Sequence, residues 1–551
     1  MTPRLLPLAV ASWLLSLFLV SPAAAPQRAA SDTRHPHAVD TLFSHSENCM
    51  ACHNSLVSPS GEDVSIGSSW RSTMMANSAR DPYWQASVRR ETIDHPSKSA
   101  DIQDECSACH MPMAQREARA ANRKGEVFSF LPFNQHQDDE GHRLAADGVS
   151  CSVCHQIAPT KLGSRESFNG QFLVNPPRPD GIREIFGPYA IDAGRRTIMR
   201  STTGFEQTEG AHVRQSELCA TCHTLITEAL GPDGRVIGSL PEQMNYQEWR
   251  HSAFYTEQRS CQSCHMPAVS GPVRASSVLG EPRPSLSRHA FVGGNAFMVR
   301  MLNRFRSDLG VEALPAELEA TARATERQLQ QDTATVAITR AAQTGSTLAL
   351  EVDVRNLTGH KFPTGYPARR AWLHVVVRQA GRVVFESGAV DESGQIRGND
   401  NDASGATFEP HYAEITDPGQ VQVYESVMGT PANAPTTGLL QATQYLKDNR
   451  LLPRGFDKAT ADREIAVAGG AATDADFTGG GDKVRFRIAL PSASGAIDVE
   501  VTLLYQSIGY RWAHNLDSYD APEPKRFVSY YGALSPASSV VVSRASIRPV
   551  Q

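Results

Sequence analysis

The chain has 551 residues, of which 40% are hydrophobic, so it holds enough apolar material for more than one globular domain. Its 59 acidic residues outnumber its 53 basic residues, and this balance lacks the basic excess that nucleic-acid-binding proteins need. The net charge of −6 therefore argues against a nucleic-acid partner.

The first 25 residues have the pattern of a secretory signal peptide. Arg4 supplies a positive charge, residues 5–20 form an apolar run, and Ala23–Ala25 offer a small-residue cleavage site. A membrane anchor is the alternative, but the run is short for a membrane span and ends at Pro22. We expect cleavage, no transmembrane segment in the mature chain, and a periplasmic or extracellular location.

Every cysteine of the chain belongs to a Cys-x-x-Cys-His motif. The five motifs contain Cys49, Cys52 and His53; Cys106, Cys109 and His110; Cys151, Cys154 and His155; Cys219, Cys222 and His223; and Cys261, Cys264 and His265. Each motif predicts covalent attachment of one haem c through two thioether bonds, with the motif histidine binding the iron from one side. Disulfides would not explain the histidine after each pair, and structural zinc combines cysteine pairs, which leaves one of five unmatched.

The ligand on the opposite face of each iron decides between electron transfer and catalysis, because an iron with two histidines has no free position for a substrate. One histidine precedes each motif by 4 to 11 positions, and another follows the last motif. We expect distal ligands among His45, His95, His212, His251 and His289, with weaker candidates in His142, His136, His360 and Met74. The alternative is that these are ordinary polar or packing residues.

After the motifs the sequence pattern changes. Residues 315–331 begin with proline and acidic residues and predict a helix. Period-two alternation then predicts strands in six segments: 333–339, 348–354, 371–377, 382–386, 484–490 and 499–505. A long insertion at about 391–480 interrupts them and contains a predicted helix near 437–447. Its acidic run at 399–402 resembles a calcium loop, although acidic turns are commoner.

These patterns predict an α+β chain of two domains. We expect a signal peptide (1–25), a loop- and helix-rich pentahaem cytochrome c domain (26–310), a connecting helix (311–331) and an immunoglobulin-like antiparallel β-sandwich (332–551). The role of the sandwich stays open, and docking or oligomerisation through it is one possibility.

The motifs, the histidines before them and the repeated Cys-His-Met-Pro signature at 109–112 and 264–267 resemble the multihaem c-type cytochromes. The resemblance covers residues 40–295 and is greatest to the superfamily of the tetrahaem nitrification cytochrome and the pentahaem electron donors. Residues 356–372 resemble a β-domain that follows the haem domain in some exported members. The resemblance implies stacked haems that pass electrons between redox partner proteins.

One departure bears on catalysis. Pentahaem nitrite reductases carry lysine in place of the histidine of one motif, whereas all five motifs end in histidine here. We therefore expect an electron carrier rather than that enzyme. The alternative function is a multihaem oxidoreductase with one open-faced haem that acts on a small nitrogen or sulfur compound.

Overall fold

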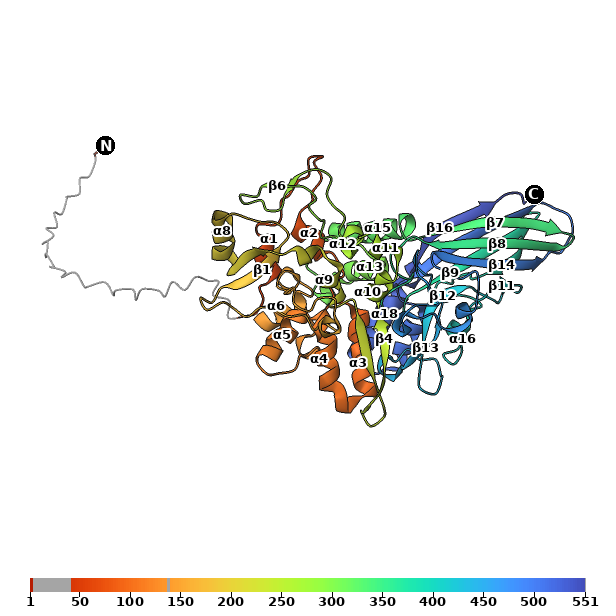
Figure 1. The fold of residues 1–551 in the computed structure, drawn as a ribbon, viewed down its shortest axis with the longest axis horizontal. Coiled ribbons are helices and arrows are strands. Elements are labelled where there is room, and N and C mark those ends of the chain that lie inside the picture. Colours follow the sequence, from red (N-terminus) through yellow and green to blue (C-terminus); the bar gives the residue numbers. More distant parts are fainter. Residues whose placement is uncertain (3–40, 136–138, 551) are drawn as a thin grey trace. The chain divides into compact units, whose positions relative to one another are not determined.

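The protein is described by a computed structural model, which covers residues 1–2, 41–135 and 139–550 (Figure 1). The predicted signal peptide and His136 lie outside the described residues. Residues 39–551 form one unit, and we refer to residues 41–310 as the N-terminal half and to residues 332–550 as the C-terminal half. Among the described residues, no helix is both long and apolar enough to cross a bilayer.

The N-terminal half consists of short helices joined by loops, with three two-stranded sheets. Its helices are α1 (Ser46–Met50), α2 (Ile66–Arg71), α3 (Pro82–Asp94), α4 (Ser99–His110), α5 (Pro112–Ala120), α6 (Glu140–Ala146), α7 (Cys151–Cys154), α8 (Ala193–Thr203), α9 (Ser216–Ala220), α10 (Asn245–Arg250), α11 (Ala253–Thr256), α12 (Cys261–His265), α13 (Ala296–Arg304) and α14 (Arg306–Leu309). The strand pairs are β1 (Arg183–Gly187) with β2 (Phe205–Glu209), β3 (Leu225–Leu230) with β4 (Val236–Gln243), and β5 (Val273–Arg274) with β6 (Pro282–Arg283).

Helix α15 (Pro315–Gln331) connects the halves and confirms the predicted helix at the same residues. Pro315 occupies the first turn, where a missing N–H costs nothing. The Glu317 side chain accepts a hydrogen bond from the Leu314 backbone N–H at 2.9 Å, which satisfies one of the amides that a helix start leaves unpaired. Leu318, Ala322 and Leu329 form the buried face.

The C-terminal half contains two sheets that enclose one apolar core. A six-stranded sheet has the order β13 (Gln444–Asp448), β12 (Val423–Gly429), β9 (Arg370–Gln379), β15 (Ile497–Gln506) and β16 (Ser539–Ile547), with β10 (Arg382–Ser387) also paired to β9. A four-stranded sheet has the order β11 (Glu414–Ile415), β14 (Gly481–Ala489), β8 (Thr347–Asn356) and β7 (Ala334–Thr344). Figure 1 shows β7, β8 and β14 side by side.

The predicted antiparallel sandwich and its six predicted strands are confirmed. All pairs in the two sheets are antiparallel except β11 with β14, which is parallel over two residues. The core comes from alternate positions of facing strands, such as Leu350 and Val352 on β8 and Val499 and Val501 on β15, all at most 1% exposed.

The predicted helix at 437–447 is wrong. The segment forms a short 3₁₀ turn (Leu439–Gln441) and then strand β13, which pairs with β12. The Glu91 carboxylate of α3 accepts a hydrogen bond from the Leu439 N–H at 2.8 Å. The backbone here is therefore satisfied by a tertiary hydrogen bond rather than by the hydrogen bonds of a helix. The supposed insertion therefore contributes two strands to the larger sheet.

The two halves share a second apolar core. Tyr83 of α3 packs edge-on against Phe527 of α18 (Pro522–Leu534), with ring centroids 5.1 Å apart. Helix α18 and its neighbour α17 (Tyr510–His514) lie between β15 and β16 in sequence, where no helix was predicted. This core, which also includes Met298 and Leu302 of α13, ties the sandwich to the motif-bearing half.

Candidate functional site

The five motifs meet around one cavity. The second, third and fifth motifs have both cysteines on helices α4, α7 and α12, where residues three positions apart share one face. Helices α1 and α9 end after the first cysteine of their motifs, and Cys52 and Cys222 lie in the turns that follow. All ten cysteines and all five motif histidines line a single cavity of about 1390 Å³, together with residues of α3, α8 and the loop at 357–369. The cysteines are all free thiols.

The thiols show which motifs are neighbours. The thiols interact in three pairs, which are Cys49 with Cys151, Cys109 with Cys222, and Cys219 with Cys261. The second motif therefore borders the fourth, and the first borders the third. The fourth motif also borders the fifth, and Cys154 of the third lies close enough to Cys222 for their charges to interact. Groups attached at the motifs would form a continuous array.

Four of the five motif histidines are held in one tautomer by backbone carbonyls. The Nδ1 atoms of His53, His110 and His155 lie 2.6, 3.0 and 2.6 Å from the carbonyl oxygens of Ala275, Ser78 and Phe186. The Nδ1 of His265 similarly contacts the carbonyl of Val292. Since a carbonyl only accepts, each Nδ1 carries the proton, and each Nε2 keeps a lone pair for a metal ion.

Two further histidines face motif histidines across the cavity. The rings of His155 and His289 are 6.3 Å apart between centroids and 22° from parallel, and the rings of His265 and His360 are 6.3 Å apart and 15° from parallel. Nδ1 of His289 lies 3.1 Å from the Ser287 carbonyl, and Nδ1 of His360 lies 2.8 Å from the Lys361 carbonyl, so both Nε2 atoms are also free.

The 6.3 Å spacing fits one metal ion between two imidazoles. A histidine nitrogen keeps about 2.0–2.1 Å from a metal such as zinc, and the ring centroid lies about 1.1 Å behind it, so two opposed rings have centroids about 6.2–6.4 Å apart. Both pairs match this separation. Burial lowers the pKa of His289 to about 3 and that of His360 to about 4, which keeps these rings neutral as a metal ligand requires.

The structure does not bring the other expected distal residues into such pairs. Nε2 of His212 donates to the Ile157 carbonyl at 2.9 Å, and Nε2 of His251 donates to the Asp457 carbonyl at 3.0 Å, so that nitrogen is used in both. His142 lies beside Asp139 and edge-on to Phe130. None of these three rings lines the cavity.

His45 and His95 differ from them, because each keeps one buried ring nitrogen without a hydrogen-bond partner: Nδ1 in His45 and Nε2 in His95. Neither ring lines the cavity. Met74 does line it, and it packs against the core that contains Tyr83. His53, His110 and His223 form no histidine pair with the described residues, and the ring of His110 instead stacks on Trp84 at 4.4 Å.

Carboxyl groups line the cavity beside the second motif. Glu242 is 4% exposed and accepts a hydrogen bond from the Thr227 hydroxyl at 2.6 Å, and burial raises its pKa to about 7. Burial also raises the pKa of Glu91 and of Glu105. All three carboxyls interact with the Cys106 thiol, so this end of the cavity can store a proton near physiological pH.

Arginines supply positive charge to the same cavity. Among the described residues Arg214, Arg259 and Arg369 have no carboxylate partner, although they line the cavity. Arg214 and Arg259 lie over the rings of Tyr189 and Phe254, whereas Arg369 donates to the Thr364 carbonyl at 2.8 Å. The propionates of a haem need such partners, so the donor set fits haem.

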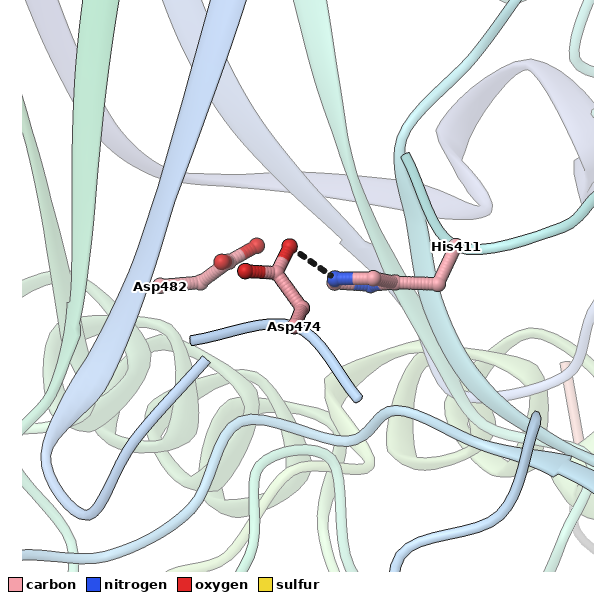
Figure 2. A group of neighbouring side chains, drawn as sticks. All are labelled: His411, Asp474 and Asp482. Atoms are coloured by element: carbon pink, nitrogen blue, oxygen red, sulfur yellow. Dashed lines mark hydrogen bonds and ion pairs between the residues drawn. The ribbon is translucent and has the colours of Figure 1, made fainter. Parts of the chain in front are cut away.

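A second cluster, in the C-terminal half, fails the test for a metal site. His411, Asp474 and Asp482 offer ligand atoms within 4.8 Å of one another (Figure 2). However, Nδ1 of His411 accepts hydrogen bonds from the side-chain amides of Gln422 and Asn449 at 3.0 and 3.1 Å. The proton therefore sits on Nε2 and is donated to Asp474 at 3.2 Å, which leaves no lone pair for a metal.

The two amides that fix this tautomer are themselves held in one orientation. The side-chain oxygen of Gln422 accepts the Tyr412 N–H at 2.9 Å, and that of Asn449 accepts the Glu425 N–H at 3.0 Å. The acidic run at 399–402 does not form a calcium loop either, because both carboxylate oxygens of Asp402 accept hydrogen bonds from Arg370.

Comparison with known proteins supports the fold. No protein-family model matches the chain, and no curated protein matches it. Among solved structures, the crystal structure of a penta-heme cytochrome c552 from Thermochromatium tepidum matches with a TM-score of 0.50 and 14% sequence identity, over 92% of this chain and 99% of that chain. The chain therefore has the overall fold of a multihaem cytochrome c.

Proposed function

We propose that the chain is an exported pentahaem c-type cytochrome that carries electrons along neighbouring haems between redox partner proteins. The observation that carries this proposal is the convergence of all five motifs on one cavity, where two motif histidines face a second histidine at 6.3 Å. When bound, each haem supplies an iron that changes between its ferrous and ferric states.

The chain's own residues would hold these groups in fixed places. The cysteine pairs would attach them, each motif histidine would supply one iron ligand, and His289 and His360 would supply a second ligand to the third and fifth irons. Carbonyl contacts at Nδ1 fix the orientation of the rings in both histidine pairs, which would limit the rearrangement that accompanies a change of iron charge. Arg214, Arg259 and Arg369 are placed to bind propionates.

The proposed organisation follows the sequence segments: a cleaved signal peptide (1–25), the pentahaem domain (26–310), the connecting helix (311–331) and the sandwich (332–551). The apolar leader supports export, and the fold of the penta-heme cytochrome c552 supports the haem domain.

A reductive titration of the purified protein tests the proposal. We expect five electrons to be taken up per chain, and fast reoxidation by a small acceptor without turnover of any substrate. Uptake of fewer than five electrons would contradict the pentahaem assignment.

The second candidate is an oxidoreductase with an open iron, and one observation favours it: His53, His110 and His223 face no second histidine from the described residues. Such an iron would be high-spin and would bind carbon monoxide when reduced. Steady turnover of nitrite, hydroxylamine or sulfite would show that the chain is this enzyme and not an electron carrier.

A further inference from the structure

Resting on the proposed function, we infer that Glu248 is a positioning residue for the fifth iron, because it joins the helix before the fifth motif to the loop that carries His360. Glu248 belongs to α10 in the N-terminal half, whereas His360 lies on the segment 357–366 between β8 and β9. The sandwich half would thus complete the haem array by supplying one of its ligands.

Glu248 accepts hydrogen bonds directly from the loop that carries His360. Its Oε2 accepts the Lys361 backbone N–H at 3.1 Å and the Thr364 hydroxyl at 2.6 Å. Lys361 is the residue whose carbonyl receives the Nδ1 proton of His360. A shift of the Glu248 carboxylate therefore moves Lys361, the residue whose carbonyl orients the His360 ring.

A buried network of four charges fixes this carboxylate. Arg450 pairs with Glu248 at 2.9 Å and with Asp448 at 2.7 Å, and Lys361 pairs with Asp448 at 2.7 Å. Glu248 and Lys361 are 0% exposed and Asp448 is 2% exposed. Two positive and two negative charges balance, so this network carries no net charge.

Burial of this network costs desolvation energy that apolar residues of the same volume would avoid, so stability alone does not account for it. The network instead fixes the position of the Glu248 carboxylate, because the loss of any one partner would leave a buried charge unpaired. The loop is restrained from the opposite side as well. Asn356 and Thr358 each donate to the His360 carbonyl at 2.8 Å, and Gly359 packs so tightly on Phe254 that a Cβ there would lie 2.9 Å from the ring.

The experiment compares two variants of the full-length, haem-loaded protein. Glu248→Gln removes the charge that holds the loop. Asp402→Asn breaks the equally buried pair with Arg370, which contacts none of residues 357–364 and serves as the matched control. We measure the haem content, the carbon monoxide bound per reduced chain, and the five midpoint potentials.

We expect Glu248→Gln to gain up to one carbon monoxide per chain and to shift one potential upward, with added imidazole reversing the binding. Asp402→Asn should change neither readout, although it lowers the melting temperature. If Glu248→Gln fails to fold, Thr364→Val removes one contact to the carboxylate and should give the same changes to a smaller extent.

Equal spectra and potentials in the Glu248 variants, the Thr364 variants and the wild type would overturn the positioning role. A failure of the proposed function looks different, because the haem content would then fall short of five in the wild type itself. If His360→Ala left carbon monoxide binding unchanged, the ligand assignment would be refuted, and the inference with it.

Discussion

The clearest stability prediction concerns Asp482, in the His411 cluster of the sandwich half. Burial, together with the charge of Asp474, raises the pKa of Asp482 to about 7. One carboxylate oxygen accepts from the Tyr424 hydroxyl at 2.8 Å and from Gln422 at 3.1 Å, and the other is buried without a partner. An amide in place of the carboxylate can keep both hydrogen bonds.

The magnitude follows from the difference in proton binding. An aspartate in the unfolded chain has a pKa of about 3.9, so the folded state binds this proton about 3 units more tightly, which corresponds to about 4 kcal/mol. The folded state is the better proton binder, so this stability is complete below pH 3.9 and is lost as the pH rises to 7. About 2.5 kcal/mol of the loss falls between pH 5 and pH 8.

Denaturant unfolding of the wild type and Asp482→Asn at pH 5 and pH 8 measures this loss. We expect the variant to gain about 2.5 kcal/mol relative to the wild type between the two pH values. Asp498→Asn, which changes a half-buried aspartate of β15 without a hydrogen-bond or ion-pair partner, is the control and should show no such pH dependence. A difference between Asp482→Asn and the wild type that is the same at both pH values would refute the reasoning.

Three further predictions concern the cavity. His360→Ala should add one carbon monoxide-binding iron per chain, reversed by imidazole, whereas His212→Ala, whose ring does not line the cavity, should add none. The pKa of Glu242 is about 7, and its ionisation next to Cys106 favours ferric iron, so one midpoint potential should fall between pH 6 and pH 8 in the wild type and stay constant in Glu242→Gln. Arg369→Gln removes a cavity-lining positive charge and should lower at least one potential; an unchanged set of five potentials would exclude a role in propionate binding.

The local parts of the structure could be predicted from the sequence. The motifs single out fifteen residues that all line one cavity, and α15 carries its start signals in Pro315 and Glu317. Alternating residues predict β8 because that strand has one buried face, and they predict the first half of β15, which is buried on both faces from Val501 onward.

The long-range parts could not be predicted in the same way. Because His212 and His251 lie close to a motif in sequence, they were the stronger candidates for distal ligands. In the structure, however, His360 from the other half of the chain faces His265. The spacing of histidines carries no information on which loop returns to which motif. Residues 439–448 likewise take their conformation from Glu91, which is distant in sequence, and from pairing with the preceding strand β12, rather than from their own helical propensity.

The proposed function requires five covalently attached haems on one chain. Intact-mass analysis of the denatured, exported protein, with a metal assay of the same sample, is the direct test of this number. We expect a mature chain that begins after residue 25, carries five haems and five irons, and retains no zinc. A chain with fewer attached haems, or with zinc on its cysteine pairs, would contradict it.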